Sequence, residues 1–230
     1  MIEIIPAIMP KTYEKLKEQI AQVRGLVQIV QLDLMDGKFT QGITWPFKDT
    51  DEQSLNNILD EKEGMPFWED IDFELDLMVS DAWENFPFYM KLGPKRMVFH
   101  IEAITDIPAF KEFLEGIDMY TRDATEFGIA INTTTPIETI YPLVNAVDFV
   151  QMMGIEHIGK QGEPFDNRVL ASIKALREKF SGVVISVDGA VNKETLPLLY
   201  AAGAERFVVG SDLFNSPYLE KELQDLESLV

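Results

Sequence analysis

The chain has 230 residues, of which 46% are hydrophobic and 26% are charged, so its composition excludes a disordered or collagen-like protein. Its 20 Lys and Arg residues stand against 39 Asp and Glu residues, which gives a formal net charge of −19. The negative electrostatic potential of such a protein repels nucleic acid and anionic membrane surfaces, and we expect neither as a partner. A small anionic ligand would need local donors, such as backbone amides or a bound cation.

The sequence contains no cysteine, which excludes disulfide bonds, thiolate metal sites and cysteine nucleophiles. The first ten residues lack the basic segment of a signal peptide and have the pattern of a strand that ends at a proline. No apolar run reaches the roughly eighteen residues of a membrane span. We therefore expect a cytoplasmic protein, and the length suits one domain with one sizeable core.

Short aliphatic runs alternate with longer amphipathic stretches along the chain, a pattern typical of repeated βα units and a parallel sheet. The predicted strands are residues 2–8, 27–34, 73–78, 96–101, 128–132, 147–153, 183–187 and 206–209. A helical stretch is expected after each strand, most clearly over residues 12–23, 170–180 (with Asp166 as its N-cap) and 193–201 (ended by Gly203). Eight such units predict a single (β/α)₈ barrel over residues 1–230, with a doubly wound sheet as the alternative fold.

The segment from about residue 38 to residue 71 is long for a connection between a strand and the next helix. It contains aromatic residues on both sides of an acidic helical stretch. Such a segment could form a lid over the barrel mouth or an oligomer contact. It could equally fold onto its own barrel.

Acidic side chains follow three of the predicted strands. Strand alternation puts Gln31 and Asp33 on one face of the second strand, and Asp76 occupies the equivalent place in the third. Asp188 ends the seventh strand. Three aspartates that converge on one barrel mouth cannot all be ionised and unpaired, so a divalent cation is expected between them. The alternative is that Asp33 caps the turn at residues 35–37 and that Asp188 belongs to an ordinary Asp-Gly turn.

Glycine-bearing loops follow the last three strands, at residues 159–162, 188–190 and 210–211. Barrels commonly bind phosphate with the backbone amides of such loops, although glycines also serve tight turns. The candidate phosphate-binding residues are Gly162, Gly189, Ala190, Gly210 and Ser211. Of the two histidines, His100 could contact a substrate or orient its neighbours, and we favour the orienting role.

In order and spacing, several segments resemble the ribulose-phosphate 3-epimerase family over essentially the whole chain. The matching segments are residues 5–9 (IPAIM), 33–37 (DLMDG), 77–79 (LMV), 99–103 (FHIEA), 130–136 (AINTTTP), 187–189 (VDG) and 202–211 (AGAERFVVGS). The resemblance implies a (β/α)₈ barrel that inverts C3 of a pentulose phosphate with two aspartates and a divalent metal. It implies that Asp33 and Asp188 are the two catalytic aspartates. Met35, Met78 and Met153 match methionines of the family's substrate pocket, to which we add His100 as a candidate.

The chain departs from the family pattern at both metal-ligand histidines, which are replaced by Gln31 and Asp76. Ala7 replaces a serine, and residues 156–163 replace a glycine-rich loop. The predicted metal ligands Gln31, Asp33, Asp76 and Asp188 offer only oxygen atoms, which favours Mg²⁺ or Mn²⁺ over Zn²⁺ or Fe²⁺.

We therefore expect a sugar-phosphate isomerase of the ribulose-phosphate 3-epimerase type that acts on a small phosphorylated sugar. A homo-oligomer is the expected assembly. Two alternatives remain open: a lyase or decarboxylase on the same barrel, and a phosphosugar-binding protein without turnover.

Overall fold

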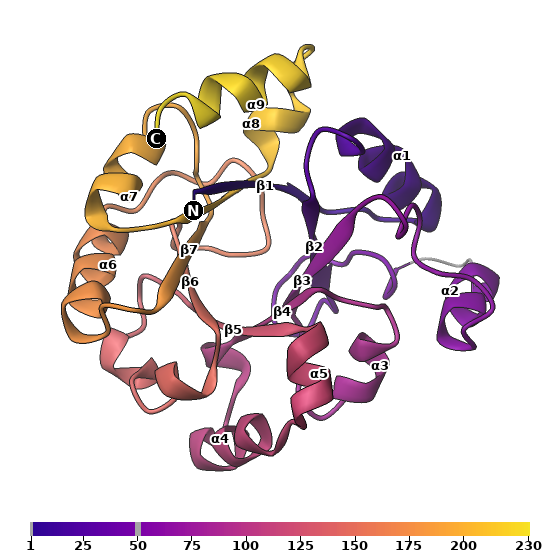
Figure 1. Ribbon diagram of the computed structural model, residues 1–230, viewed down its shortest axis with the longest axis horizontal. Coiled ribbons are helices and arrows are strands. Elements are labelled where there is room, and N and C mark those ends of the chain that lie inside the picture. The colour runs from indigo at the N-terminus through magenta and orange to yellow at the C-terminus, as the bar shows by residue number, and fades with distance from the viewer. Residues whose placement is uncertain (1, 49–51) are drawn as a thin grey trace.

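The computed structural model describes residues 2–48 and 52–230. Eight parallel strands form a closed barrel in which each strand pairs with the next and β8 pairs with β1 (Figure 1). The strands are β1 (Glu3–Ile8), β2 (Ile29–Met35), β3 (Asp72–Met78), β4 (Arg96–His100), β5 (Glu126–Ile131), β6 (Phe149–Met153), β7 (Val184–Asp188) and β8 (Arg206–Val209). The predicted barrel is thereby confirmed and the doubly wound alternative is wrong.

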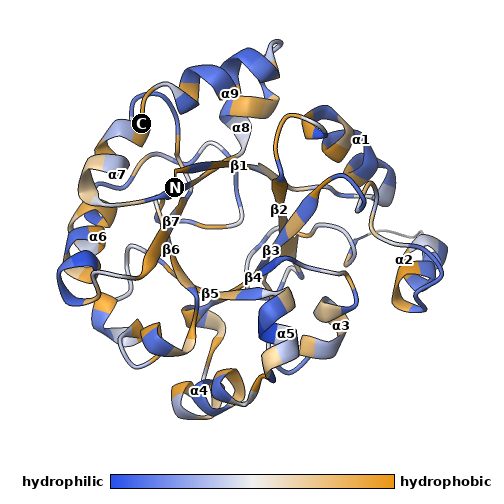
Figure 2. Cartoon of the chain, viewed as in Figure 1, coloured by the Kyte–Doolittle hydropathy of each residue, from blue (hydrophilic) through white to orange (hydrophobic). Residues whose placement is uncertain are grey.

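The helices surround the barrel as an outer ring (Figure 1). They are α1 (Tyr13–Val23), α2 (Glu52–Leu59), α3 (Phe86–Met90), α4 (Ile107–Gly116), α5 (Met119–Ala124), α6 (Arg168–Lys179), α7 (Leu196–Ala202), α8 (Ser211–Phe214) and α9 (Leu219–Glu227). Figure 2 shows mostly hydrophobic strands and outer helices that mix hydrophobic with hydrophilic residues. None of the helices in the described ranges has the length and apolar composition that a bilayer crossing requires.

Helix α1 illustrates how the sequence pattern determines the outer ring. The Thr12 side chain accepts a hydrogen bond from the backbone N–H of Lys15, which satisfies one of the free donors at the start of the helix. The helix buries Leu16, Ile20 and Val23 against the barrel, at spacings of four and three residues. Gly203 ends α7 with a φ of 116°, a left-handed conformation that glycine adopts readily, as the sequence predicts.

Two helix predictions need correction. Residues 132–148, between β5 and β6, contain no α-helix but two short 3₁₀ helices, Ile137–Ile140 and Val144–Ala146. Pro136 and Pro142 explain this, because each lacks a backbone N–H and restricts the residue before it. Helix α6 begins at Arg168, so Asp166 precedes the N-cap position and accepts the Arg168 backbone N–H from outside the helix.

Part of the long segment between β2 and β3 folds onto the barrel. Trp45 is fully buried, its ring centroid lies 6.0 Å from that of Tyr13, and its backbone N–H donates to the carbonyl of Pro10. Trp68 is 60% exposed. Residues 49–51 of this segment lie outside the described residues, and its role as a lid or oligomer contact stays a prediction.

Several polar side chains are buried in the interior of the barrel. Gln31, Asp33, Glu74, Asp76, His100, Gln151 and Ser186 are all buried. At the amino-terminal end of the strands, Arg96 forms ion pairs with Glu3 at 3.0 Å and Glu126 at 3.2 Å. Buried charges need partners, and the glutamates at this end have arginine partners. At the opposite, carboxyl-terminal end of the strands, three aspartates lie together, which indicates that the functional site is there.

Candidate active site at the carboxyl ends of the strands

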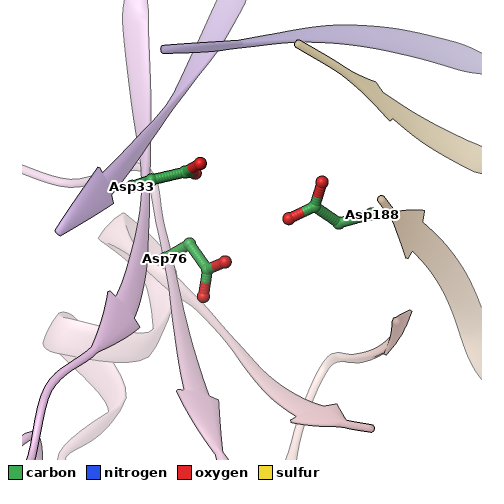
Figure 3. A group of neighbouring side chains, drawn as sticks. All are labelled: Asp33, Asp76 and Asp188. Atoms are coloured by element: carbon green, nitrogen blue, oxygen red, sulfur yellow. The ribbon is translucent and has the colours of Figure 1, made fainter. Parts of the chain in front are cut away.

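Three aspartates from three strands meet at the mouth of the barrel. Asp33 and Asp76 are register partners near the ends of β2 and β3, and Asp188 is the last residue of β7. Each offers one carboxylate oxygen, and these atoms lie within 4.8 Å of one another. Figure 3 shows Asp33 and Asp188 pointing toward each other from opposite sides, with Asp76 on the side of Asp33. Period-two alternation along the parallel strands aims all three side chains inward.

The amide of Gln31 connects two of the carboxylates. Its Nε2 donates to Asp33 Oδ1 at 2.8 Å and to Asp188 Oδ2 at 3.2 Å. Its Oε1 is buried and has no hydrogen-bond partner among the residues that the structure describes. A buried amide oxygen without a partner is costly, so this atom is free to accept a hydrogen bond or to bind a cation.

The mutual repulsion of the carboxylates changes their proton affinity. Burial, followed by the charges of Asp188 and Asp76, raises the pKa of Asp33 well above its ordinary value. Burial and the charge of Asp76 raise the pKa of Asp188 to about 7. A divalent cation between these groups would reverse the effect, because an adjacent positive charge favours the ionised form.

Two buried side chains contact the carboxylate of Asp76. His100 Nε2 lies 2.8 Å from Asp76 Oδ1, and Gln151 Nε2 donates to Asp76 Oδ2 at 3.3 Å. Burial lowers the pKa of His100, but the Asp76 carboxylate outweighs it and the net shift is upward. The Phe39 ring covers the imidazole at 5.5 Å between centroids. His100 therefore lies buried against Asp76, and its role in orienting that carboxylate stays a prediction.

The site fits a divalent cation. Three convergent carboxylates form an all-oxygen donor set, which suits a hard divalent cation. In contrast to an imidazole site, this set has no soft or nitrogen ligand that would favour Zn²⁺.

A cavity of about 440 Å³ opens above the aspartates. The predicted site residues that line it are Asp33, Met78, Met153, Gly162, Asp188, Gly189, Ala190, Gly210 and Ser211. Gln31, Asp76 and His100 are fully buried and do not appear in this lining. Met35 lines a neighbouring cavity instead. The fold thus brings the predicted catalytic and phosphate-binding residues to one space.

Two glycines explain how closely the loops approach. A Cβ on Gly154 would lie 2.1 Å from the carbonyl oxygen of Gly189, so the loops after β6 and β7 can touch only with glycine there. Gly159 has a φ of +82°, and a Cβ on it would lie 2.7 Å from the Cβ of Thr40. The loop after β6 therefore contacts the loop after β2 across the barrel mouth.

Several lining residues were not predicted from the sequence. Among the described residues that line the cavity, Lys160 is the positively charged one. Three further carboxylates lie near the glycine loops, those of Glu163, Glu194 and Asp212. Burial and the charge of Glu222 raise the pKa of Asp212. A lysine between two glycines at 159–162 is a signal that could have identified Lys160, because an anionic ligand of an acidic protein needs a local cation.

Comparison with known proteins agrees with this geometry. A family model described as the ribulose-phosphate 3 epimerase family matches residues 3–214. Ribulose-phosphate 3-epimerase of Bacillus subtilis is 25% identical over an alignment of 232 positions that covers 98% of each chain. The same-named protein of Eremothecium gossypii is 27% identical over 214 residues, covering 92% of this chain and 85% of that protein.

Among solved structures, the crystal structure of 3-hexulose-6-phosphate synthase superposes with a TM-score of 0.66 and 19% identity over all of both chains. This likeness concerns the barrel fold. The family match spans nearly the whole chain and includes the strand ends that carry Asp33, Asp76 and Asp188. The chain therefore belongs to the ribulose-phosphate 3-epimerase family, a family of carbohydrate epimerases.

Proposed function

We propose that this chain inverts C3 of a ketose phosphate by moving protons between the substrate and two aspartates. The observation that carries the proposal is the placement of Asp33 and Asp188, which point toward each other from opposite sides of one cavity (Figure 3). A sugar carbon between two carboxylates can lose its proton on one face and receive a proton on the other. That exchange of faces is what inversion requires.

The roles of the two aspartates follow from their positions. One carboxylate removes the C3 proton as a general base, and the other, in its protonated form, returns a proton from the far side. The amide of Gln31 donates to both carboxylates and so keeps them on opposite sides of the cavity. Asp76, fixed by His100 and Gln151, adds the third carboxylate of the site.

The proposed cofactor is Mg²⁺ or Mn²⁺, held by Asp33, Asp76, Asp188 and the free oxygen of Gln31. When bound, such an ion would stabilise the negative charge that develops on the oxygens of an enediolate. The methionine side chains of Met78 and Met153 line the cavity and limit the access of water to the reacting carbon.

The phosphate group is proposed to lie at the glycine loops, against the backbone of Gly162, Gly189, Ala190, Gly210 and Ser211. Gly189 and Ala190 have φ values of 97° and 53°, so the chain turns tightly where it borders the cavity. Lys160 supplies a positive charge in this lining. These local groups offset the repulsion expected from the net charge of −19.

The test is NMR of ribulose 5-phosphate in D₂O with the purified protein, first without metal and then with Mg²⁺, Mn²⁺ or Zn²⁺. We expect deuterium to enter at C3 and the C3 epimer, xylulose 5-phosphate, to appear with Mg²⁺ or Mn²⁺. No exchange at C3 of any ketose phosphate with any of the metals would overturn the proposal. Tight binding of the sugar phosphate without exchange would instead identify a binding protein.

A lyase or decarboxylase is the second candidate, because the same carboxylate cluster would support an enediolate whether proton removal or carbon–carbon cleavage produces it. Product analysis with ketose phosphates and keto-acid phosphates distinguishes the two reactions. A cytoplasmic location and a homo-oligomeric state stay predictions.

A further inference from the structure

A second cavity, of about 600 Å³, adjoins the catalytic cavity at the barrel mouth. Three loops form it: the loop after β1 with Met9 and Lys11, the loop after β2 with residues 41–44 and Lys48, and the tip of the loop after β6 with residues 159–161. Met9 and residues 159–161 line both cavities. We call the second one the lysine cavity, after Lys11, Lys48 and Lys160.

The lysine cavity is a concentration of positive charge on a strongly negative protein. Its lining contains three lysines and, among the described residues, no carboxylate. All three lysines are exposed, and none forms an ion pair with a carboxylate in residues 2–48 or 52–230, whereas Lys193 pairs with two acidic residues. A cleft lined by one sign of charge attracts ions of the opposite sign.

Hydrogen bonds and a close backbone approach connect the three loops that carry the lysines. The Trp45 N–H donates to the carbonyl of Pro10 at 2.8 Å, and the Thr44 N–H donates to the carbonyl of Met35 at 3.1 Å. These bonds join the loop after β2 to the loop after β1 and to its own strand. The loop after β6 packs closely against Gly42, because a Cβ on Gly42 would lie 3.1 Å from the carbonyl oxygen of Gly159. The contacts between these three loops therefore define the shape of the cavity.

We propose that the lysine cavity binds an oxyanion, phosphate or carboxylate, and that this oxyanion is a second anionic group of the sugar phosphate in the catalytic cavity. The inference rests on the proposed function, since it places the substrate in the catalytic cavity. Lys160 and Gln161 line both spaces, so one ligand can contact both. The preferred substrate class is accordingly a ketose with two anionic groups, and a ketose with a single phosphate binds more weakly.

Calorimetric titration of the full chain with a pentulose 1,5-bisphosphate and with the matching 5-phosphate tests the proposal. We expect the bisphosphate to bind at least about ten-fold more tightly. Lys11→Gln and Lys48→Gln should each reduce that advantage about three- to ten-fold and leave the affinity for the 5-phosphate unchanged. Lys174→Gln, an exposed lysine on α6, is the matched control and should change neither affinity.

Inorganic phosphate, titrated in the presence of the 5-phosphate, distinguishes a group on the sugar from a free anion. Binding of inorganic phosphate that depends on Lys11 and Lys48, without an advantage for the bisphosphate, would support the oxyanion site but overturn its assignment to the substrate. If neither probe responds to either substitution, the lysine cavity is no anion site. Failure of the proposed function would appear separately, as absence of C3 exchange in the unmodified protein.

Discussion

Gln31 and Asp188 are 157 residues apart in the sequence, yet Gln31 Nε2 lies 3.2 Å from Asp188 Oδ2 inside the barrel. The same nitrogen donates to Asp33 Oδ1. One neutral amide therefore joins two carboxylates that burial and mutual repulsion would otherwise drive to protonate or separate. This arrangement keeps both proposed acid–base groups in place at the cavity without a positively charged side chain between them.

The first prediction concerns these two carboxylates. Asp33→Asn and Asp188→Asn should each lower the rate of C3 exchange about 10²- to 10⁴-fold, because an amide cannot accept or return the proton. The substitutions keep the side-chain shape, so the thermal midpoint and the affinity for the sugar phosphate should change little. NMR in D₂O measures the exchange. Asp123→Asn, an exposed site on α5, is the control; unchanged exchange in both active-site variants would disprove the assignment.

The second prediction concerns the all-oxygen donor set. The double variant Gln31→His with Asp76→His should shift metal preference from Mg²⁺ or Mn²⁺ toward Zn²⁺, because imidazole nitrogen is a softer ligand than carboxylate oxygen. Competition with a chromophoric chelator gives the affinity for each ion. The variant Gln31→Leu is the control, because it removes a ligand without adding nitrogen. An unchanged ratio of the Zn²⁺ and Mn²⁺ affinities would show that these two side chains do not ligate the metal.

The third prediction concerns the close approach of the loops after β6 and β7. Gly154→Ala would place a Cβ 2.1 Å from the carbonyl oxygen of Gly189, and the Gly154 N–H also donates to the carbonyl of Asp188. Relief of this overlap must displace Gly189 or Asp188. We expect a loss of about 1–3 kcal/mol in the free energy of unfolding and a reduced exchange rate.

Urea denaturation and the exchange assay measure the two effects of Gly154→Ala. Gly182→Ala is the matched control, because a Cβ at Gly182 meets no heavy atom within 4 Å. Equal stability and activity of the two variants would mean that the loops after β6 and β7 can separate without affecting Asp188.

Much of the site could be predicted from the sequence because it follows from local alternation. In β2, Gln31 and Asp33 face inward since each lies two residues from the next inward position. The same reasoning applies to Asp76. The turn after β2 was also foreseen, although the Asp36 carboxylate, rather than Asp33, accepts the backbone N–H groups of Lys38 and Phe39 that close it.

Other features depend on how strands and loops from different parts of the chain meet, which no local pattern reports. The pair of His100 and Asp76 joins adjacent strands, and its contact follows from their register and inward facing. Lys160 lines a cavity with residues 41–44 only because the loop after β6 reaches the loop after β2. The absence of an α-helix between β5 and β6 is different, because Pro136 and Pro142 are local signals against a continuous helix.

The last prediction concerns Glu74, which lies fully buried at the opposite end of the barrel interior with Arg96 Nη1 3.5 Å from its Oε2. Burial raises the pKa of Glu74 from 4.5 to about 7, and Arg96 and Arg206 only partly offset this. Between these two pH values the folded protein keeps a proton that the unfolded chain releases. The contribution of Glu74 to the free energy of unfolding is therefore greatest below pH 4.5 and declines as the pH rises to about 7.

The substitution Glu74→Gln removes this titration, so the variant should gain stability relative to the unmodified protein as the pH rises. At about 1.36 kcal/mol per pKa unit, the relative gain between about pH 5.5 and about pH 8 is about 2 kcal/mol. Urea denaturation at several pH values measures it, with the exposed Glu112→Gln as control. Because Arg96 keeps its ion pairs with Glu3 and Glu126, the variant should still fold. A stability difference that does not vary with pH would show that Glu74 is ionised throughout, compensated by the two arginines.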